Sequence, residues 1–375
     1  MKHTIYALTM FALAACTPPK EKAIDRHALV TRNNPEVTAM DSLSSLSVGN
    51  GEFAYTVDAT GLQTFPEVYK NGVPLGTQSQ WGWHSFGNPE NYKPEEALVE
   101  YDFGHGHKEL YATQPKEPGR AKEASDWYRV NPHRLHLGII GLELGNEVRP
   151  SDVQNIQQSL DMWNGIINSR FTLKETPYYI QTVCHPERDM IAARLSARQP
   201  ASIKFHFPYP TGGHCDDACN WEANDKHSTT LISEDAQSAV LKRTLDATTY
   251  YVTISWEGPA KLSEKSANYF VLTPTDSIFT FTCQFTPQVS ASPILTFTEV
   301  QQVSSGHWKN YWTQGAVADF SQCTDVRAKE LERRVVLSQY LLAIQCAGST
   351  PPQETGLTYN SWFGKFHLEM IWWHQ

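Results

Sequence analysis

The sequence predicts a mainly β protein, a large antiparallel β-sandwich followed by helices towards its end. Two observations predict this order. Short segments rich in β-branched and aromatic residues recur up to about residue 285, and turn signals such as Asn71-Gly72 separate them. From about residue 304 the apolar residues recur with a helical period instead. The predicted units are residues 1–15, a signal peptide; 16–40, a tether; 41–300, the sandwich; and 301–375, the helical part.

The first sixteen residues have the pattern of a bacterial export signal. Lys2 and His3 are positively charged, and residues 4–13 form an apolar run that is too short to span a bilayer. The segment Leu13-Ala14-Ala15-Cys16 resembles a lipobox, in which Cys16 becomes the lipid-modified first residue of the mature protein. The alternative is an ordinary signal peptide followed by an unmodified cysteine. We expect a lipid anchor at Cys16, which attaches the protein to a membrane of the bacterial cell envelope, in the periplasm or at the cell surface.

Charge and aromatic content point to a class of ligand. The formal net charge of −9 leaves no basic face for a phosphate backbone, so nucleic acid is not an expected partner. The chain contains 11 Trp and 16 Tyr, whose flat rings with a polar edge suit sugars as well as sandwich cores. We expect an oligosaccharide ligand and no cofactor.

Six cysteines follow Cys16, and two of them, Cys215 and Cys219, lie in the stretch "GGHCDDACNW". In an exported protein such a pair either closes a small disulfide loop or remains as free thiols. His214 and two aspartates lie in the same loop. Their spacing matches no standard zinc motif, so no metal site is expected.

The predicted sandwich begins with Phe53, Tyr55 and Val57, which alternate with smaller residues. The other predicted strands span residues 171–175, 178–184, 190–197, 203–207, 239–245, 250–256 and 269–285. The stretch "HPERD" at 185–189 lies between two of them. Its proline favours a turn, so we interpret Arg188 as the partner of a neighbouring acid rather than as part of a catalytic cluster.

Helical periodicity begins in "SSGHWKNYWTQGA", where Ser304 is a plausible N-cap. Trp308 and Trp312 follow, four residues apart on one face of the predicted helix. The next helix is the clearest in the chain. Thr324 is suited to cap it, and Gly348 with the prolines that follow stops it.

In this second helix Leu331, Val335, Leu342 and Cys346 fall close to one stripe. Between residues 335 and 344 the apolar positions cover more than half of the circumference, so the helix needs cover on two sides. We expect that cover to come from further helices of a domain that this sequence only begins. The 375-residue chain should therefore expose apolar surface.

Three passages carry a resemblance to a known family. They are "QQSLDMWNGIINSRFTLKETPYYIQTVCHPERDMIAARLSA", the pair "WKNYWTQGAVADFS" and "DVRAKELERRVVLSQYLLAIQ", and "PPQETGLTYNSWFGKFHLEMIWWH". Together they resemble glycoside hydrolase family 65 and its relatives among the six-hairpin glycosidases. The resemblance implies a galactose-mutarotase-like super-sandwich joined to an (α/α)6 barrel, of which only the start lies before Gln375. It also implies inverting cleavage of α-linked oligosaccharides.

The resemblance has consequences for site residues. The catalytic acid of the family lies on a later barrel loop, so no catalytic residue is assigned in this chain. Phe366-His367-Leu368-Glu369 falls on a Trp-Asp-Thr-Glu segment whose carboxylates hold sugar hydroxyls in the family. Glu369 matches the glutamate, whereas His367 stands in place of the aspartate.

From the residues themselves, Lys365, His367 and Glu369 offer hydrogen-bond donors and acceptors, and Trp362 and Trp373 offer stacking faces. Glu354 lies on a loop towards the same predicted barrel mouth, and it is either a ligand or a solvated acid. The alternative for Glu369 is an ion pair with Lys365 at i,i+4 spacing, with the tryptophans in the core. The rival function is a non-catalytic, surface-anchored glycan-binding module.

Overall fold

The computed structural model describes residues 23–290 and 293–374. Cys16 and the predicted signal peptide lie outside the described residues, so lipidation stays a prediction.

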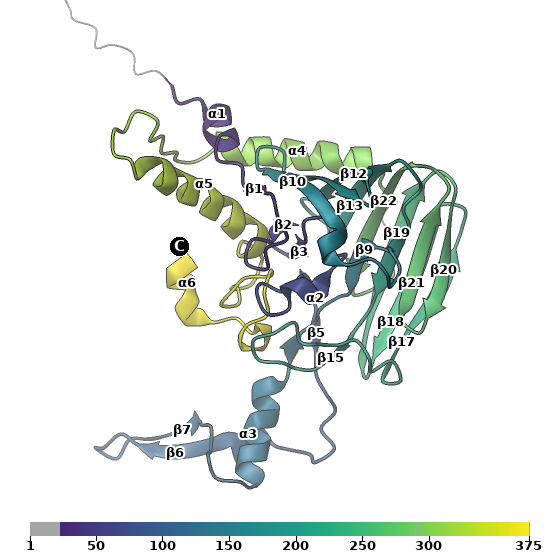
Figure 1. Ribbon diagram of the computed structural model, residues 1–375. Helices are drawn as coiled ribbons and strands as arrows, with labels where there is room; N and C mark the ends of the chain where they lie inside the picture. The colour runs from purple at the N-terminus through teal and green to yellow at the C-terminus, as the bar shows by residue number, and fades with distance from the viewer. Residues whose placement is uncertain (1–22, 291–292, 375) are drawn as a thin grey trace, which may run out of the picture.

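A nine-stranded antiparallel sheet is the largest element (Figure 1). Its strands follow the order β1-β10-β11-β12-β13-β22-β19-β18-β17. The bounds are β1 Glu36–Val37, β10 Val153–Asp161, β11 Ile166–Leu173, β12 Thr176–Cys184, β13 Met190–Ala197, β22 Ile278–Thr286, β19 Thr248–Glu257, β18 Ser238–Leu245 and β17 His227–Glu234. The predicted mainly β fold with a large antiparallel sheet is confirmed.

A second, four-stranded sheet has the order β20-β21-β14-β9, and smaller sheets surround it. Its bounds are β20 Ala260–Ser266, β21 Tyr269–Pro274, β14 Ile203–His206 and β9 Ile139–Leu142. The smaller sheets are β2 Leu46–Gly49 with β3 Phe53–Val57 and β4 Thr77–Ser79; β5 Trp83–His84 with β8 His133–Arg134; β6 Leu98–Asp102 with β7 Lys108–Ala112; and β15 Tyr209–Pro210 with β16 Cys219–Asn220.

Helices lie mainly around the sheets. They are α1 Arg26–Thr31, α2 Pro66–Tyr69, α3 Arg120–Val130, α4 Phe297–Thr313, α5 Ala328–Gln345 and α6 Leu368–His374, with the 3-10 turns η1 Pro94–Ala97, η2 Pro150–Asp152 and η3 Trp362–Gly364. Among residues 23–290 and 293–374, no helix is both long and apolar enough to cross a bilayer.

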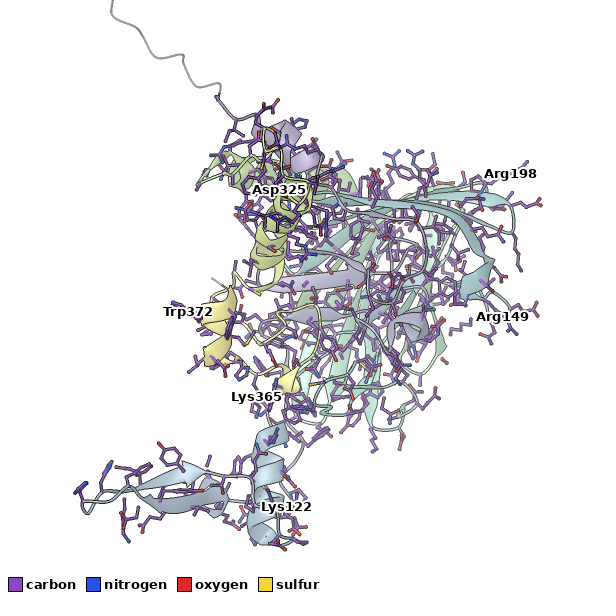
Figure 2. All side chains as sticks on the ribbon, turned by 60° about the vertical axis from the view of Figure 1, so that its left-hand side comes forward. Lys122, Arg149, Arg198, Asp325, Lys365 and Trp372 are labelled. Atoms are coloured by element: carbon purple, nitrogen blue, oxygen red, sulfur yellow. The ribbon has the colours of Figure 1, made fainter. Side chains whose placement is uncertain are left out.

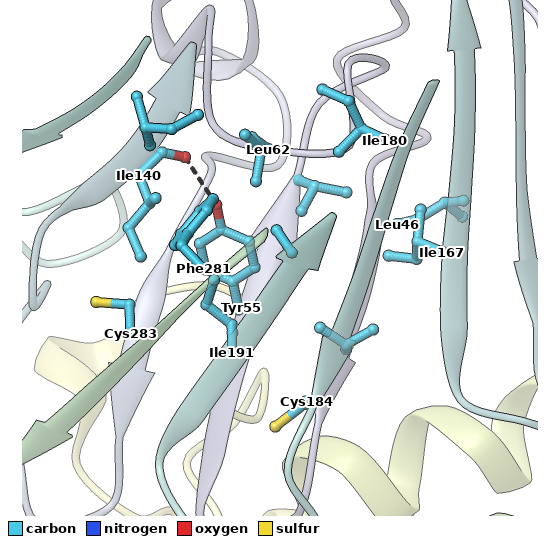
Figure 3. Close-up of a cluster of buried hydrophobic side chains, with 14 of the residues drawn as sticks. Leu46, Tyr55, Leu62, Ile140, Ile167, Ile180, Cys184, Ile191, Phe281 and Cys283 are labelled. Carbon is cyan, nitrogen blue, oxygen red and sulfur yellow. Dashed lines mark hydrogen bonds between the residues drawn. The ribbon is translucent and has the colours of Figure 1, made fainter. Parts of the chain in front are cut away.

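The core lies between the sheets, where apolar side chains from β2, β3, β9, β13 and β22 meet (Figure 3). Tyr55 is fully buried there, and its hydroxyl donates a hydrogen bond of 2.7 Å to the Ile140 carbonyl. A buried hydroxyl costs little when it is hydrogen-bonded, so this bond lets an amphipathic ring join two sheets.

The α4 helix packs on β12, β13 and β22, on the outer face of the large sheet. It begins seven residues before the predicted Ser304, because Thr296 and Glu299 form a capping box there. Trp308 and Trp312 are 4% and 6% exposed, and the Trp312 indole donates to the Met162 carbonyl.

The α5 helix packs on β2 and β3, so the sandwich itself covers one side of it. Its buried stripe consists of Ala328, Glu332, Val336, Tyr340 and Ile344. The predicted stripe was wrong by about one position, since Leu331 is 52% exposed while Val335, Leu342 and Cys346 are only half-buried. A glutamate can occupy the buried stripe because Arg32, Asn33 and the Phe320 amide all donate to it.

The start of α5 also differs from the prediction. Arg327 occupies the N-cap position instead of Thr324, and its amide donates to the Asp325 carboxylate. The predicted exposure of apolar surface is confirmed on α6, where Trp372 and Trp373 are 81% and 69% exposed.

Replacing Tyr340 with phenylalanine tests how α5 is attached. Tyr340 is fully buried beside the Trp308 ring, and its hydroxyl donates to the Ser47 carbonyl at 3.1 Å. The Tyr340→Phe variant should lose about 1 kcal/mol of unfolding free energy in urea denaturation, because the Ser47 carbonyl loses its donor. The control is Tyr311→Phe, whose hydroxyl bonds to the Gln339 carbonyl at the surface. Equal losses of unfolding free energy in both variants would contradict the stabilising role of the buried hydrogen bond from Tyr340 to Ser47.

Residues 85–132, between β5 and β8, form an arm that projects from the body (Figures 1 and 2). The arm consists of η1, the β6–β7 hairpin and α3. Its root is held by the short pairing of β5 with β8, in which Trp83 lies opposite Arg134 and His84 opposite His133. This insertion brings residues of the arm root next to the end of the chain.

Candidate functional site

Three segments that are distant in the sequence meet at the root of the arm. They are residues 128–134, the loop 211–221 that contains "GGHCDDACNW", and residues 353–367. The loop and the late segment are joined by three hydrogen bonds. The Asn360 amide donates to the Gly213 carbonyl at 3.0 Å, the Tyr359 hydroxyl to the Cys215 carbonyl at 3.1 Å, and the Phe363 amide to the His214 carbonyl at 3.2 Å. We name this place the junction site.

The backbone of the junction site contains a left-handed turn. Trp362, Phe363 and Gly364 have φ values of 49°, 61° and 68°. Residues with a Cβ rarely adopt this region, and each such residue costs on the order of 1 kcal/mol. Glycine is required at the third position, since a Cβ there would overlap the Arg134 side chain. Two consecutive strained aromatic residues are a feature that clusters at functional sites.

The turn presents the Trp362 ring, which is 40% exposed. The His214 ring meets it edge-on at 4.5 Å, and the Arg129 guanidinium lies 5.3 Å from its centre. The His367 ring is 5.8 Å away. A half-exposed indole with an arginine and two imidazoles around it can stack on a flat ligand and hydrogen-bond its rim.

Lys365 holds the arm root to the late segment. Its ammonium donates to the carbonyls of Tyr128 and Asn131 at 3.0 and 3.2 Å. Burial, and then the nearby Arg129, lower the pKa of Lys365. Within the described residues it forms no ion pair with Glu369, so the i,i+4 alternative for that pair is wrong.

Glu354 lies on the same segment, where the Ser361 hydroxyl donates to its carboxylate at 2.9 Å. The same hydroxyl is 3.7 Å from the Cys215 sulfur. Cys215 and Cys219 are both free thiols, so the disulfide alternative for this loop is wrong. Burial raises the pKa of Cys219 well above its ordinary range, which favours an unreactive thiol.

Glu369 and Trp373 lie apart from this cluster, on α6. Both are exposed, and no hydrogen bond joins Glu369 to His367 within the described residues. Figure 2 shows Lys365 beside the root of the arm and Trp372 further along the body. The structure therefore brings Trp362, Lys365, His367 and Glu354 together and leaves Glu369 and Trp373 on a separate surface.

Buried polar atoms without partners gather at the junction site. Among the described residues nine buried side-chain nitrogen or oxygen atoms have no hydrogen-bond partner, and six of them are here. The six are His133 Nδ1, Arg134 Nε, His214 Nε2, Gln353 Oε1, Asn360 Oδ1 and His367 Nδ1. A buried polar atom left without a partner costs about 1–3 kcal/mol. The clustering favours a place that a polar ligand or ordered water completes.

In the stretch "HPERD", the observed partner of Arg188 differs from the predicted one. The Arg188 guanidinium donates to the Pro293 carbonyl at 3.0 Å and forms no ion pair among the described residues, so its predicted acidic partner was wrong. Asp189 accepts from the Ser79 hydroxyl and from the Trp81 indole. Burial raises the pKa of Asp189 to about 6.

Arg129 and His214 were not among the predicted site residues. Both lie far from Trp362 in the sequence, and neither is part of a recognisable motif. The two residues before Gly364 are aromatic, which is unusual for a left-handed turn, and Gly364 lies against the Arg134 side chain.

Comparisons with known proteins give a fold likeness and no family. No protein-family model and no curated protein matches the sequence. Among solved structures, a protein of the human microbiome assigned as a kojibiose phosphorylase aligns with 85% of this chain and 42% of its own, at 10% identity and a TM-score of 0.44. A bacterial glucoamylase complexed with acarbose aligns over 83% and 44%, at 8% identity and a TM-score of 0.39. The family GH92 α-mannosidase of Bacteroides thetaiotaomicron aligns over 84% and 41%, at 9% identity and a TM-score of 0.33. This chain thus spans less than half the length of each, and at this similarity their activities do not carry over to it.

Proposed function

We propose that the junction site binds the end of an oligosaccharide, with Trp362 as the stacking face. The observation that carries this proposal is the strained left-handed turn at Trp362 and Phe363, surrounded by buried polar atoms that lack partners. Sugars present an apolar ring face and a rim of hydroxyls. An indole with imidazole, amide and guanidinium groups around it meets both requirements.

The wider activity in this proposal is that of a carbohydrate-active lipoprotein of the bacterial cell envelope. In this proposal the chain is part of an inverting glycosidase that acts on α-linked oligosaccharides, and a lipid is attached at Cys16. The three passages that resemble family 65 and its relatives support this interpretation. Cys16 lies outside the described residues and no catalytic acid is assigned among them, so each part of the proposal needs its own experiment: mass spectrometry of the mature N-terminus for the lipid, and turnover assays for the glycosidase activity.

Changing Trp362 to glycine tests the site. Glycine adopts the left-handed region without strain, so Trp362→Gly relieves about 1 kcal/mol of backbone strain, which offsets part of the packing lost with the half-buried indole, while it removes the stacking face. Binding of maltose, kojibiose or trehalose oligomers, measured by calorimetry on the 375-residue chain, should weaken at least tenfold.

The matched control is Trp373→Ala, because Trp373 is more exposed than Trp362 and lies on α6 away from the cluster. It should leave binding unchanged. If oligosaccharide binding is unchanged in Trp362→Gly, or weakens equally in both variants, the junction site is not the binding site.

The rival function is a non-catalytic glycan-binding module. It predicts the same loss of binding in Trp362→Gly, but no release of reducing sugar from a bound oligosaccharide by any longer form of the protein. Hydrolysis of the oligosaccharide by a longer form of the protein would support the glycosidase and exclude the non-catalytic module.

A further inference from the structure

The outer face of the nine-stranded sheet is divided into two halves of different chemistry. Under α4 it is apolar, because Ile166, Val183, Met190 and Ala192 pack on Phe297 and Val300 of the helix. Further along the same strands lies a shallow groove of about 630 Å³, in which polar side chains such as Gln157, Arg170 and Ser196 stand among apolar ones such as Pro177. Figure 2 shows Arg198, at one end of this groove, on the opposite side of the body from Trp372. The groove is therefore separate from the junction site.

A row of outward side chains crosses four strands of this half. Gln157 of β10 lies opposite Arg170 of β11, Arg170 opposite Tyr179 of β12, and Tyr179 opposite Ser196 of β13. Neighbouring strands are about 4.8 Å apart, so the row is about 14 Å long. The sheet fixes the backbone of such a row, so the spacing of its side chains is set before a ligand binds.

The aromatic residue of the row is fixed in place. The Arg170 guanidinium lies 4.5 Å from the centre of the Tyr179 ring. The Tyr179 hydroxyl donates to the Asn168 side-chain carbonyl at 2.8 Å, and the Gln181 amide donates to the same oxygen at 3.0 Å. The Asn168 carbonyl is thus used internally, which leaves its two amide protons for an outside acceptor.

Charge distinguishes this groove from the rest of the molecule. Arg170 and Arg198 line it, and Arg194 lies beside them, opposite Gln181. None of the three forms an ion pair with any residue that the structure describes. No acidic residue lines the groove, although the whole chain has a formal net charge of −9. Three unpaired guanidinium groups on a fixed sheet form a site for carboxylate or sulfate groups.

We propose that this groove, the arginine groove, binds an acidic oligosaccharide, with carboxylates on the arginines and ring hydroxyls on Gln157, Asn168 and Ser196. The amide and hydroxyl groups match sugar hydroxyls, and the tyrosine provides one ring face. The groove would hold an acidic glycan on the body while the junction site acts on its own ligand.

The test compares two sugars of equal length on the full 375-residue chain, a galacturonate oligosaccharide and a maltooligosaccharide. The galacturonate should bind, and its affinity should fall with salt, because guanidinium groups contact its carboxylates. In the double variant Arg170→Ala, Arg198→Ala its affinity should fall at least tenfold. The matched control is Arg334→Ala, an exposed arginine that pairs with Glu330 on α5.

Several results would overturn the proposal. They are absence of galacturonate binding, a galacturonate affinity that does not fall with salt, and an unchanged galacturonate affinity in the double variant. Binding to phosphatidylserine vesicles without binding to the oligosaccharide would also overturn it, in favour of a membrane contact. The double variant should leave maltooligosaccharide binding at the junction site unchanged, so failure of the junction site and failure of the arginine groove give different results.

Discussion

Replacing Arg243 with leucine is expected to lower the free energy of unfolding by several kcal/mol, because each buried acceptor that loses its donor costs about 1–3 kcal/mol. Arg243 is fully buried, and its guanidinium donates to Thr229, Asn268, His227 and the Pro208 carbonyl at 2.7–3.1 Å. These acceptors are neutral. Leucine fills most of the space, but the Pro208 carbonyl and His227 Nδ1 lose the guanidinium donor, whereas the Asn268 side-chain oxygen keeps the Thr229 hydroxyl as a donor.

Two variants give the comparison for Arg243. Arg194→Leu changes an exposed arginine of the same large sheet and should alter the free energy by less than about 0.5 kcal/mol. Arg243→Lys keeps the charge with three donors in place of five, so its loss should be intermediate. Urea denaturation followed by tryptophan fluorescence measures all three. A loss below about 1 kcal/mol for Arg243→Leu would mean that water replaces the guanidinium and that the network is not a stabilising unit.

Stability should also fall steeply as pH decreases from about 6.5 to 4. Burial, together with nearby positive groups, lowers the pKa of His133, His206 and His227 from 6.5 to about 4. For His227 the guanidinium of Arg243 is one of these groups, since it donates to Nδ1 at 2.7 Å and requires that nitrogen to be unprotonated. Between pH 6.5 and 4 these histidines bind protons in the unfolded chain but not in the folded chain. The free energy of unfolding therefore falls as the pH decreases.

Asp189 acts in the opposite direction over the same range. Burial raises the pKa of Asp189 from 3.8 to about 6, so the folded chain holds this proton more tightly than the unfolded chain does. For these four groups, three histidines against one carboxyl give a net uptake of roughly two protons on unfolding near pH 5, or on the order of 2 kcal/mol per pH unit. The histidines therefore determine the sign of the slope of unfolding free energy against pH.

Unfolding curves at pH 7, 6, 5 and 4.5 measure this slope. His227→Gln should make it shallower by about one proton, because glutamine can accept from Arg243 without titrating. Asp189→Asn should make it steeper by about the same amount. A slope that is flat or of opposite sign in the unsubstituted protein would contradict the assignment of the three buried histidines as neutral.

Much of the sandwich was predictable because strand patterns are local. Alternation of buried and half-buried residues with a period of two runs along β18, where Leu241 and Leu245 are buried, and a predicted segment falls on this strand. The limits of this approach appear at residues 269–285, a predicted single strand. The structure has two strands there, β21 and β22, in different sheets, joined through the turn at 275–277.

The helical part shows where a periodic pattern is insufficient. The α5 helix was predicted, but its buried face was assigned about one position away from the observed stripe. Apolar residues occupy much of its circumference, so periodicity alone does not choose the face. The choice is made by the contact with β2 and β3, and by Arg32, which neutralises Glu332 in the buried stripe.

The candidate site was predicted in part. Trp362, Lys365, His367 and Glu354 do lie together, whereas Glu369 and Trp373 lie on the exposed α6 helix. His214 and Arg129 were not predicted, because each is far from Trp362 along the chain. Contacts over such separations depend on how the whole chain packs, and a single sequence carries no direct signal for them.

The sequence by itself determined the class of this protein: antiparallel strands followed by helices, an acidic chain rich in aromatic residues, and a late segment with groups suited to sugars. These properties follow from composition and from periods of a few residues, which act locally. Only the tertiary structure decided which side chains meet. It inserted an arm between β5 and β8, placed the loop 211–221 against the late segment, and turned Trp362 outward through a left-handed turn. The physical reason is that each of these arrangements is stabilised by contacts between distant segments, whose burial and hydrogen bonds offset the local strain.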